Sequence, residues 1–236
     1  MSKIINLIVK NKISPFKKLI KVDSDKSLSI RSFLIGAISQ NKSYVKNVLE
    51  SEDVLSTIKC LKKLKVKIRK IKSKNYIIYG NGLGSLQASK NLKLNFGNSG
   101  TLARLLIGIL STTKNIEIIM SGDKSLNKRN MKKLIDLMSQ FGATFLPKKK
   151  YTLPLKMISS MMPVGIYYKA GVSAQLKSAV ILAGLNSFGN TTIEEKNLSR
   201  NHTENILKKN KKSIKIYGTT KKIIKIYGKN NLQPLK

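Results

Sequence analysis

Three stretches of the chain place Leu, Ile and Ala at the i, i+3, i+4 spacing of an amphipathic helix, at 27–39, 101–111 and 174–185. An extended apolar segment precedes each of them, at 19–22, 92–96 and 166–168. A short strand pattern follows each of them, at 43–48, 116–120 and 191–194. The first half of a β-α-β-α-β-β unit is therefore predicted three times.

The second half of each unit is also visible in the pattern. Further helices are expected at 52–64, 129–141 and 201–208. Paired strands then close the units, most clearly 66–71 with 76–79 and 214–217 with 223–227. A fixed period of this kind indicates like units that share one core, so the predicted fold class is α/β (α+β) with three units.

Polar residues recur at the start of each leading helix. Ser27 is followed four residues later by Arg31, Gly100 by Arg104 and Ser173 by Lys177, and both sets are spaced by 73 residues. Free N–H groups and the positive end of the helix dipole favour an anion there. The alternative for each Ser or Thr is ordinary helix capping. Three such helix starts facing one way predict a site for a multiply anionic ligand.

The few arginines and the high net charge of the chain bear on its ligand in different ways. Only five of the 46 basic residues are arginine, and four of these, Arg31, Arg104, Arg129 and Arg200, lie in short polar motifs. Arg grips carboxylate and phosphate in a bidentate fork that Lys does not offer. The net charge of +35 leaves a nucleic-acid or other polyanion partner open as the alternative. The lysines are spread along the whole chain, however, so no specific nucleic-acid partner is expected.

The numbers of cysteine and histidine residues exclude two kinds of site. Cys60 and His202 stand alone, which excludes an internal disulfide framework and a Cys/His zinc cluster. A reducing, cytoplasmic setting is expected. The longest apolar run, 105–110, is too short to span a bilayer, so no membrane partner is expected.

Four motifs then resemble one family. Residues 25–31 (DKSLSIR) look like the Lys-Ser-x-x-x-Arg segment of the 5-enolpyruvylshikimate-3-phosphate synthase family, and 97–101 (GNSGT) followed by Arg104 resembles its Gly-Asn-Ala/Ser-Gly-Thr signature. Residues 173–179 (SAQLKSA) and 198–204 (LSRNHTE) resemble two more of its signatures, in the same order. A related transferase carries a reactive Cys in a loop, but Cys60 lies in an apolar helical pattern and is predicted to be core.

The resemblance implies a shikimate-pathway transferase. Such an enzyme moves the enolpyruvyl group of phosphoenolpyruvate onto the 5-hydroxyl of shikimate 3-phosphate and releases phosphate. The implied fold has three β-α-β-α-β-β units around a pseudo-threefold axis, as one domain of an inside-out α/β barrel. No metal or organic cofactor is implied, and the two substrates are the implied small-molecule partners.

The same resemblance implies roles for individual residues. Lys26 is the catalytic candidate because it would touch both substrates. The residues implied to bind shikimate 3-phosphate are Lys26, Ser27, Arg31, Ser173, Ala174, Gln175, Ser199 and Arg200. Those implied to bind phosphoenolpyruvate are Lys26, Asn98, Gly100, Arg129 and Gln175.

Members of this family are normally nearly twice as long and have two similar domains. By this comparison, residues 1–21 would pack with a second domain, 22–230 would form the three-unit domain, and 231–236 would be a truncated crossover. The units would span about 22–85, 92–158 and 165–228. A truncated gene model, a gene fragment and a separately encoded second half all stay open. The isolated chain is expected to bind shikimate 3-phosphate weakly and to have negligible transferase activity.

Overall fold

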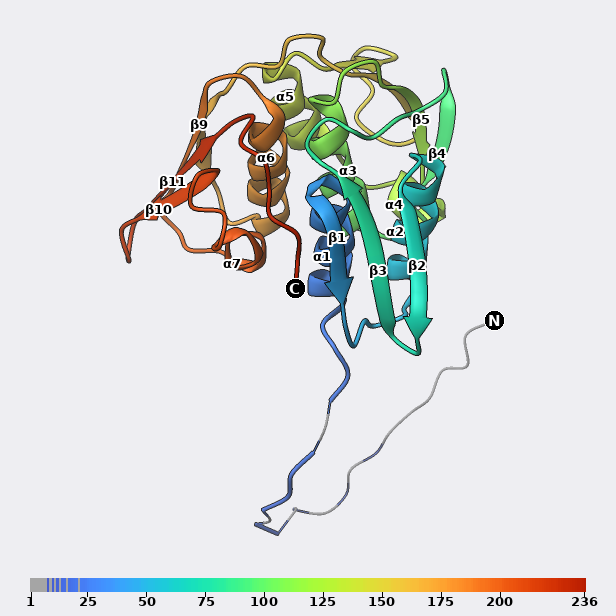
Figure 1. Cartoon of the computed structure of the whole chain (residues 1–236), viewed down its shortest axis with the longest axis vertical. Helices are drawn as coiled ribbons and strands as arrows, with labels where there is room; N and C mark the ends of the chain where they lie inside the picture. The colour runs from blue at the N-terminus through green and yellow to red at the C-terminus, as the bar shows by residue number, and fades with distance from the viewer. Residues whose placement is uncertain (1–7, 9, 11, 13, 16, 21) are drawn as a thin grey trace.

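The computed structural model describes residues 8, 10, 12, 14–15, 17–20 and 22–236. Three small β-sheets surround a central group of helices, and the described residues that precede residue 26 extend away from this body (Figure 1). In the part of the chain that is described, no helix combines the length and apolar character needed to cross a membrane.

The first unit contains a three-stranded antiparallel sheet with strand order β1-β3-β2. Its elements are α1 (Lys26–Ile38), β1 (Gln40–Val45), α2 (Glu52–Lys63), β2 (Lys67–Lys72) and β3 (Asn75–Asn81). The two helices confirm the predicted ones to within one residue at each end. The strand expected at 43–48 begins three residues earlier than predicted.

The second unit contains a four-stranded sheet with strand order β4-β5-β7-β6, in which β4 is parallel to β5. Its elements are β4 (Leu92–Asn95), α3 (Gly100–Ser111), β5 (Glu117–Ser121), α4 (Lys124–Asn127), α5 (Lys132–Gln140), β6 (Thr144–Leu146) and β7 (Leu155–Ile158). The helix predicted at 129–141 is shorter than expected, and the four-residue helix α4 was not predicted. A single helical turn shows no periodicity in sequence.

The third unit repeats this plan with strand order β10-β11-β9-β8, again with a parallel leading pair, β8 and β9. Its elements are β8 (Tyr167–Ala170), α6 (Ala174–Asn186), β9 (Asn190–Glu195), α7 (His202–Leu207), β10 (Ile214–Tyr217) and β11 (Lys222–Tyr227). The leading helix and both closing strands are where the sequence predicts them.

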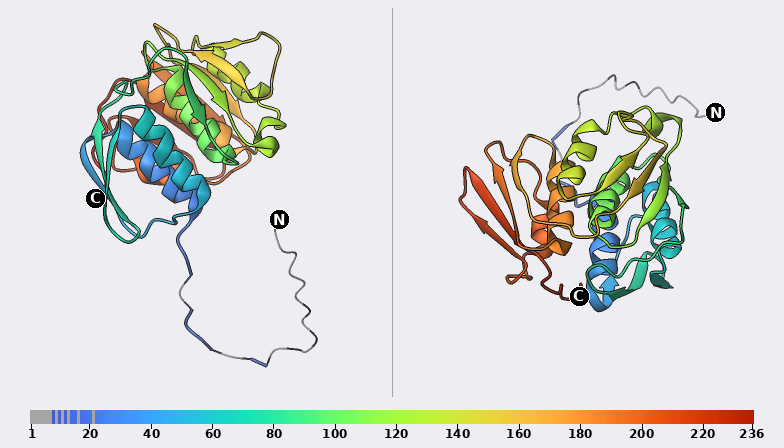
Figure 2. Two further views of the ribbon diagram at one scale, coloured as in Figure 1. Left: turned by 90° about the vertical axis from the view of Figure 1, so that its right-hand side faces the viewer. Right: turned by 90° about the horizontal axis from the view of Figure 1, so that it is seen from above.

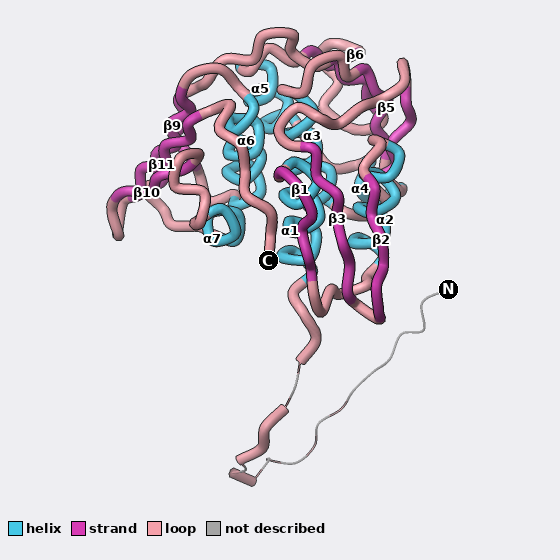
Figure 3. Tube along the Cα trace, in the orientation of Figure 1, coloured by secondary structure: helices cyan, strands magenta, loops and turns pink. Residues whose placement is uncertain are grey.

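The leading strand of the first unit is not where the sequence predicts it. Residues 19, 20 and 22 belong to no strand, and Leu19 is 99% exposed. Residues 232–235 lie beside β1 instead. Gln40 N–H donates to Leu232 O and Tyr44 N–H donates to Leu235 O, each at 2.9 Å. The pairing is parallel to β1, and Figure 3 shows this segment as a loop near β1 and α1. The free edge of β1 is therefore partly covered by a segment from the far end of the chain.

The three leading helices sit side by side inside the ring of sheets (Figure 2), and their buried side chains pack with those of α2, α5 and the strands in one core. Almost all residues of α3 and α6 are buried. The two helices approach closely at Gly108, where an added Cβ would lie 2.6 Å from the backbone O of Ala179. Cys60 is also core, as predicted: it is 1% exposed, and burial raises the pKa of its thiol to about 12.

The structural repeat is 74 residues, one more than the spacing of the basic residues. The N-cap residues of the leading helices are Asp25, Ser99 and Ser173, and each side chain accepts a hydrogen bond from the N–H three residues on. These positions are 74 apart, whereas Arg31, Arg104 and Lys177 are 73 apart. Counted from its cap, the basic residue therefore moves back by one position in each successive unit. One position is about 100° around a helix, so the three basic side chains do not share one direction.

Candidate anion-binding site

The starts of the three leading helices share one pocket of about 390 Å³. Lys26 comes from α1, Gly100 and Thr101 come from α3, and Gln175 comes from α6. The other lining residues are Glu52, Asp53, Asn98 and Arg129. Residues from three different units are thus brought within reach of one small ligand.

Two guanidinium groups meet over Gly100. A Cβ added there would lie 2.7 Å from Nη1 of Arg104 and 2.8 Å from Nη1 of Arg129. Burial, followed by the nearby charge of Arg129, lowers the pKa of Arg104. No carboxylate among the described residues forms an ion pair with either group. Two like charges held together without a counter-charge favour a bound anion.

Hydrogen bonds hold these side chains in place. Nη1 of Arg104 donates to Gly100 O at 3.1 Å and to Oε1 of Gln175 at 3.0 Å. Nε2 of Gln175 donates to Oγ1 of Thr101 at 2.9 Å, which ties α6 to α3. Nη2 of Arg129 donates to Oδ1 of Asn98 at 3.0 Å. The amide groups therefore fix the orientation of both guanidiniums.

Lys26 is paired with a carboxylate at the start of the next helix along the chain, α2. Its Nζ lies 3.1 Å from Oδ2 of Asp53, and Glu52 lines the same pocket. The side chain of Asp53 is 18% exposed and that of Lys26 is 48% exposed. The sequence shows that Glu52 and Asp53 begin the next helix along the chain. It does not show that the start of this helix lies at the pocket.

Ser173 and Ala174 do not line this pocket. Ser173 caps α6 and, with Arg104, lines a neighbouring pocket of about 430 Å³. Ala174 is buried at the first turn of α6. Arg104 lies between the two pockets, although it was not among the residues assigned to a substrate.

Arg31 is largely enclosed. It is 3% exposed and donates to Oγ1 of Thr203 at 2.8 Å, to Oγ of Ser178 at 3.2 Å and to the backbone O of Ser27 at 3.0 Å. Burial lowers its pKa, the charge of Glu204 opposes this, and Arg200 adds to the lowering. Three of its five N–H donors are thus engaged inside the protein.

Like Arg31 and Arg104, the third basic residue of the repeat does not line the shared pocket, contrary to expectation. Lys177 is fully buried, and its Nζ lies 2.8 Å from Oε1 of Glu195 and 2.7 Å from Oε1 of Glu204. Ser199 donates from both N–H and Oγ to the same oxygen of Glu195, at 2.8 and 2.7 Å. Arg200 is exposed. The fold therefore turns this charge inward, behind Ser199.

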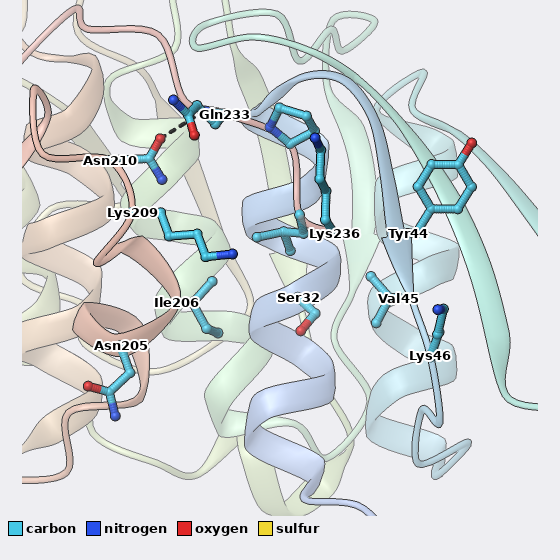
Figure 4. Close-up of a pocket in the computed structure, with 12 residues that line it drawn as sticks. Ser32, Tyr44, Val45, Lys46, Asn205, Ile206, Lys209, Asn210, Gln233 and Lys236 are labelled. Carbon is cyan, nitrogen blue, oxygen red and sulfur yellow. Dashed lines mark hydrogen bonds between the residues drawn. The ribbon is translucent and has the colours of Figure 1, made fainter.

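A larger cavity, about 670 Å³, lies elsewhere and contains none of the predicted site residues (Figure 4). It is bounded by α1, β1, α7 and the segment 233–236. Asn210 holds this segment by accepting a hydrogen bond from Gln233 N–H at 2.8 Å. Size alone does not identify the site here.

Comparison with known proteins decides the family. Residues 10–236 match the sequence profile described as EPSP synthase (3-phosphoshikimate 1-carboxyvinyltransferase). The chain belongs to the EPSP synthase family. Curated members that it resembles include a 3-phosphoshikimate 1-carboxyvinyltransferase from Paramagnetospirillum magneticum, 39% identical over 188 residues, and one from Thermodesulfovibrio yellowstonii, 38% identical over 219 residues.

A solved EPSP synthase supports the same assignment. The structure of the enzyme from Acinetobacter baumannii matches with a TM-score of 0.83 at 35% identity, over 92% of this chain and 48% of that chain. The two curated relatives are matched over 79% and 92% of this chain, but over only 42% and 50% of their own lengths. The chain therefore spans about half the length of the EPSP synthases that it matches.

Proposed function

We propose that this chain forms the part of an EPSP synthase that binds shikimate 3-phosphate and contributes to binding phosphoenolpyruvate. The reaction transfers the enolpyruvyl group to the 5-hydroxyl of shikimate 3-phosphate and releases phosphate. The single observation that carries this proposal is the shared pocket, in which Lys26, Asn98 and Gln175 line one space beside two guanidiniums that form no ion pair with a carboxylate of the described residues.

The charge of the pocket suits these substrates. Both are phosphorylated, and phosphoenolpyruvate also carries a carboxylate, so the site must offset several negative charges before the reactants meet. Lys26 and Arg129 line the pocket, and the guanidinium of Arg104 meets that of Arg129 beside Gly100. Glu52 and Asp53 also line the pocket and Asp53 pairs with Lys26, so Arg104 and Arg129 are the cations that no carboxylate of the described residues neutralises in an ion pair. Charge-assisted hydrogen bonds contribute about 1.5–3 kcal/mol each, and holding two anionic reactants in line accounts for much of the rate gain in such reactions.

The residue roles follow from the family motifs and stay part of this proposal. Lys26 would contact both substrates and act as the catalytic residue. Shikimate 3-phosphate would be held by Ser27, Arg31, Ser173, Ala174, Gln175, Ser199 and Arg200. Phosphoenolpyruvate would be held by Asn98, Gly100, Arg129 and Gln175. Arg104 belongs with this second group, because its guanidinium faces Arg129 across Gly100.

The finer architecture is also proposed. The three units would surround a pseudo-threefold axis and form one domain of a two-domain enolpyruvyl transferase, with the reaction in the cleft between domains. No residue of this chain matches the family's acid–base groups of proton transfer. We therefore propose that the 236-residue chain binds substrate but needs a second domain, in the same protein or as a separate chain, for turnover.

Calorimetric titration of the purified chain with shikimate 3-phosphate tests this proposal. One saturable site is expected, and Lys26→Met should raise its Kd about tenfold, because a charge-assisted contact is lost. Lys215→Met, on the exposed strand β10, is the matched control and should leave the Kd unchanged. Phosphate release from phosphoenolpyruvate should be undetectable with the chain alone. The absence of saturable binding would refute the binding role, and turnover would refute the need for a second domain.

The rival function is binding of nucleic acid or another polyanion. It is favoured by the charge of +35 and by lysines stacked on tyrosines of the sheets, such as Lys67 over Tyr79 and Lys215 over Tyr227. Such binding would depend steeply on salt, with the slope spread over many lysines. Saturation by shikimate 3-phosphate with a shallow salt slope would decide against it.

A further inference from the structure

Lys177 sits in a buried ionic cluster that the proposed chemistry does not use. Its side chain is 0% exposed, Glu195 is 0% exposed and Glu204 is 3% exposed. The three residues come from α6, β9 and α7. Burying three ionised groups is costly, and a well-packed apolar cluster often gives equal or greater stability. Stability alone therefore does not account for this cluster.

The contacts of Glu195 point toward the segment 196–201. Its Oε1 atom receives three hydrogen bonds, from Nζ of Lys177 and from the N–H and Oγ of Ser199. Its other oxygen, Oε2, is buried and has no hydrogen-bond partner among the described residues. Burial raises the pKa of Glu195, but the bonds from Lys177 and Ser199 outweigh it and lower the pKa overall. The carboxylate is thus charged at neutral pH and grips Ser199 strongly.

The segment 196–201 has little else to hold it. It forms no helix or strand, and residues 196–198, 200 and 201 are exposed. Its far end leads into α7, where Oγ1 of Thr203 accepts from Arg31 and donates to Ser178 at 2.8 Å. Both ends of the segment are therefore fixed by buried polar contacts of α6 and α1.

We propose that Lys177 is a positioning residue: through Glu195 it holds Ser199 and Arg200 in the conformation that receives the anionic substrate. This inference rests on the proposed function, since Ser199 and Arg200 would complete the shikimate 3-phosphate site. The proposal also explains why Lys177 faces inward. Arg31 and Arg104 of the first two units are oriented by hydrogen bonds to neighbouring helices. Lys177 of the third unit instead pairs with Glu195, which holds the segment 196–201.

Two variants test the proposal in the full 236-residue chain. Glu195→Gln keeps the shape and an acceptor near Ser199 but removes the charge, and Glu204 still pairs with Lys177. Lys177→Met removes the cation. Hydrogen-exchange mass spectrometry reports the order of segment 196–201, and calorimetry reports the Kd for shikimate 3-phosphate. Glu117→Gln, which removes the carboxylate paired with Lys156 on another sheet, is the matched control.

We expect exchange in segment 196–201 to become at least tenfold faster in Glu195→Gln and faster still in Lys177→Met. The Kd for shikimate 3-phosphate should rise about tenfold, while Glu117→Gln changes neither quantity. Unchanged exchange in this segment in folded Glu195→Gln would overturn the proposal, and so would weaker binding without any loosening. If the unaltered chain binds no shikimate 3-phosphate, the proposed function fails, and the exchange result alone decides whether Lys177 and Glu195 order the loop.

Discussion

Helices α3 and α6 each carry a basic residue near their start, yet the two charges lie in opposite surroundings. Arg104 is half-buried, faces Arg129 over Gly100 and has no carboxylate partner among the described residues. Lys177 is fully buried between Glu195 and Glu204. Arg104 lies five residues after its N-cap and Lys177 lies four after its own. A shift of one residue turns the side chain by about 100°, so that Arg104 meets Arg129 beside Gly100 whereas Lys177 points into the core.

The comparison shows that equal spacing in sequence is not equal position in the fold. The helix caps repeat every 74 residues and the basic residues every 73. The residues that do share a structural position are Lys26, Gly100 and Ala174, each the first residue of its helix. The first two line the anion pocket and the third is buried beside it.

The largest expected effect separates the two bases directly. Lys177→Met leaves two carboxylates buried without their cation, which should lower the free energy of unfolding by about 3–5 kcal/mol. Arg104→Met removes a charge that Arg129 repels, so its loss should stay below about 1 kcal/mol. Urea denaturation of both variants measures the difference. Equal losses would show that the two sites are energetically alike.

The next effect concerns the contact between the two helices. Gly108→Ala places a Cβ 2.6 Å from the backbone O of Ala179, so α3 and α6 must move apart. Overpacking of this kind costs about 1–3 kcal/mol. In the control Gly36→Ala, on α1, the nearest atom is a side-chain methyl of Ile78 at 3.0 Å, which can yield. Thermal unfolding should show the larger fall in Tm for Gly108→Ala.

A third substitution should alter the site and leave the fold. Gly100→Ala places its Cβ against the flexible ends of Arg104 and Arg129, which must shift. Stability should change by less than about 1 kcal/mol, but affinity for phosphoenolpyruvate should fall about tenfold. Gly171→Ala, where a Cβ meets nothing within 4 Å, is the control. Unchanged phosphoenolpyruvate affinity in Gly100→Ala would argue against an arginine clamp.

The smallest expected effect is a pH dependence. The pKa of Glu195 in the folded chain is lowered, so its contribution to stability is present above the ordinary Glu value of about 4.3. That contribution is lost as pH falls through the lower, folded value. The stability difference between the unaltered chain and Glu195→Gln should be constant from about pH 7 to 5 and shrink below about 4. Urea unfolding at several pH values measures it, and a difference that grows in acid would contradict the buried ion pair.

Much of the fold was predictable because its helices are long and strongly patterned. The leading helices α1, α3 and α6 lie within one residue of the predicted bounds. The prediction of a leading strand at 19–22 was wrong, because an apolar run in the sequence does not show which strand it would pair with. Residues 232–235 pair with β1 instead, nearly two hundred residues away in sequence.

The site was predictable in part for the same reason. Local sequence identified Lys26, Asn98, Gly100, Arg129 and Gln175, all of which line the shared pocket. It did not identify Asp53 as the partner of Lys26 or Arg104 as the partner of Gln175. These contacts join residues from different elements, and no local pattern encodes them.

The sequence by itself determined where the helices begin, which small and capping residues open them, and which cations lie near their starts. Those properties follow from hydrophobic periodicity and hydrogen bonding within a few residues. Only the tertiary structure decided the direction of each charge, because direction depends on helix rotation and on what packs opposite. Arg104 meets another arginine there, whereas Lys177 meets two carboxylates.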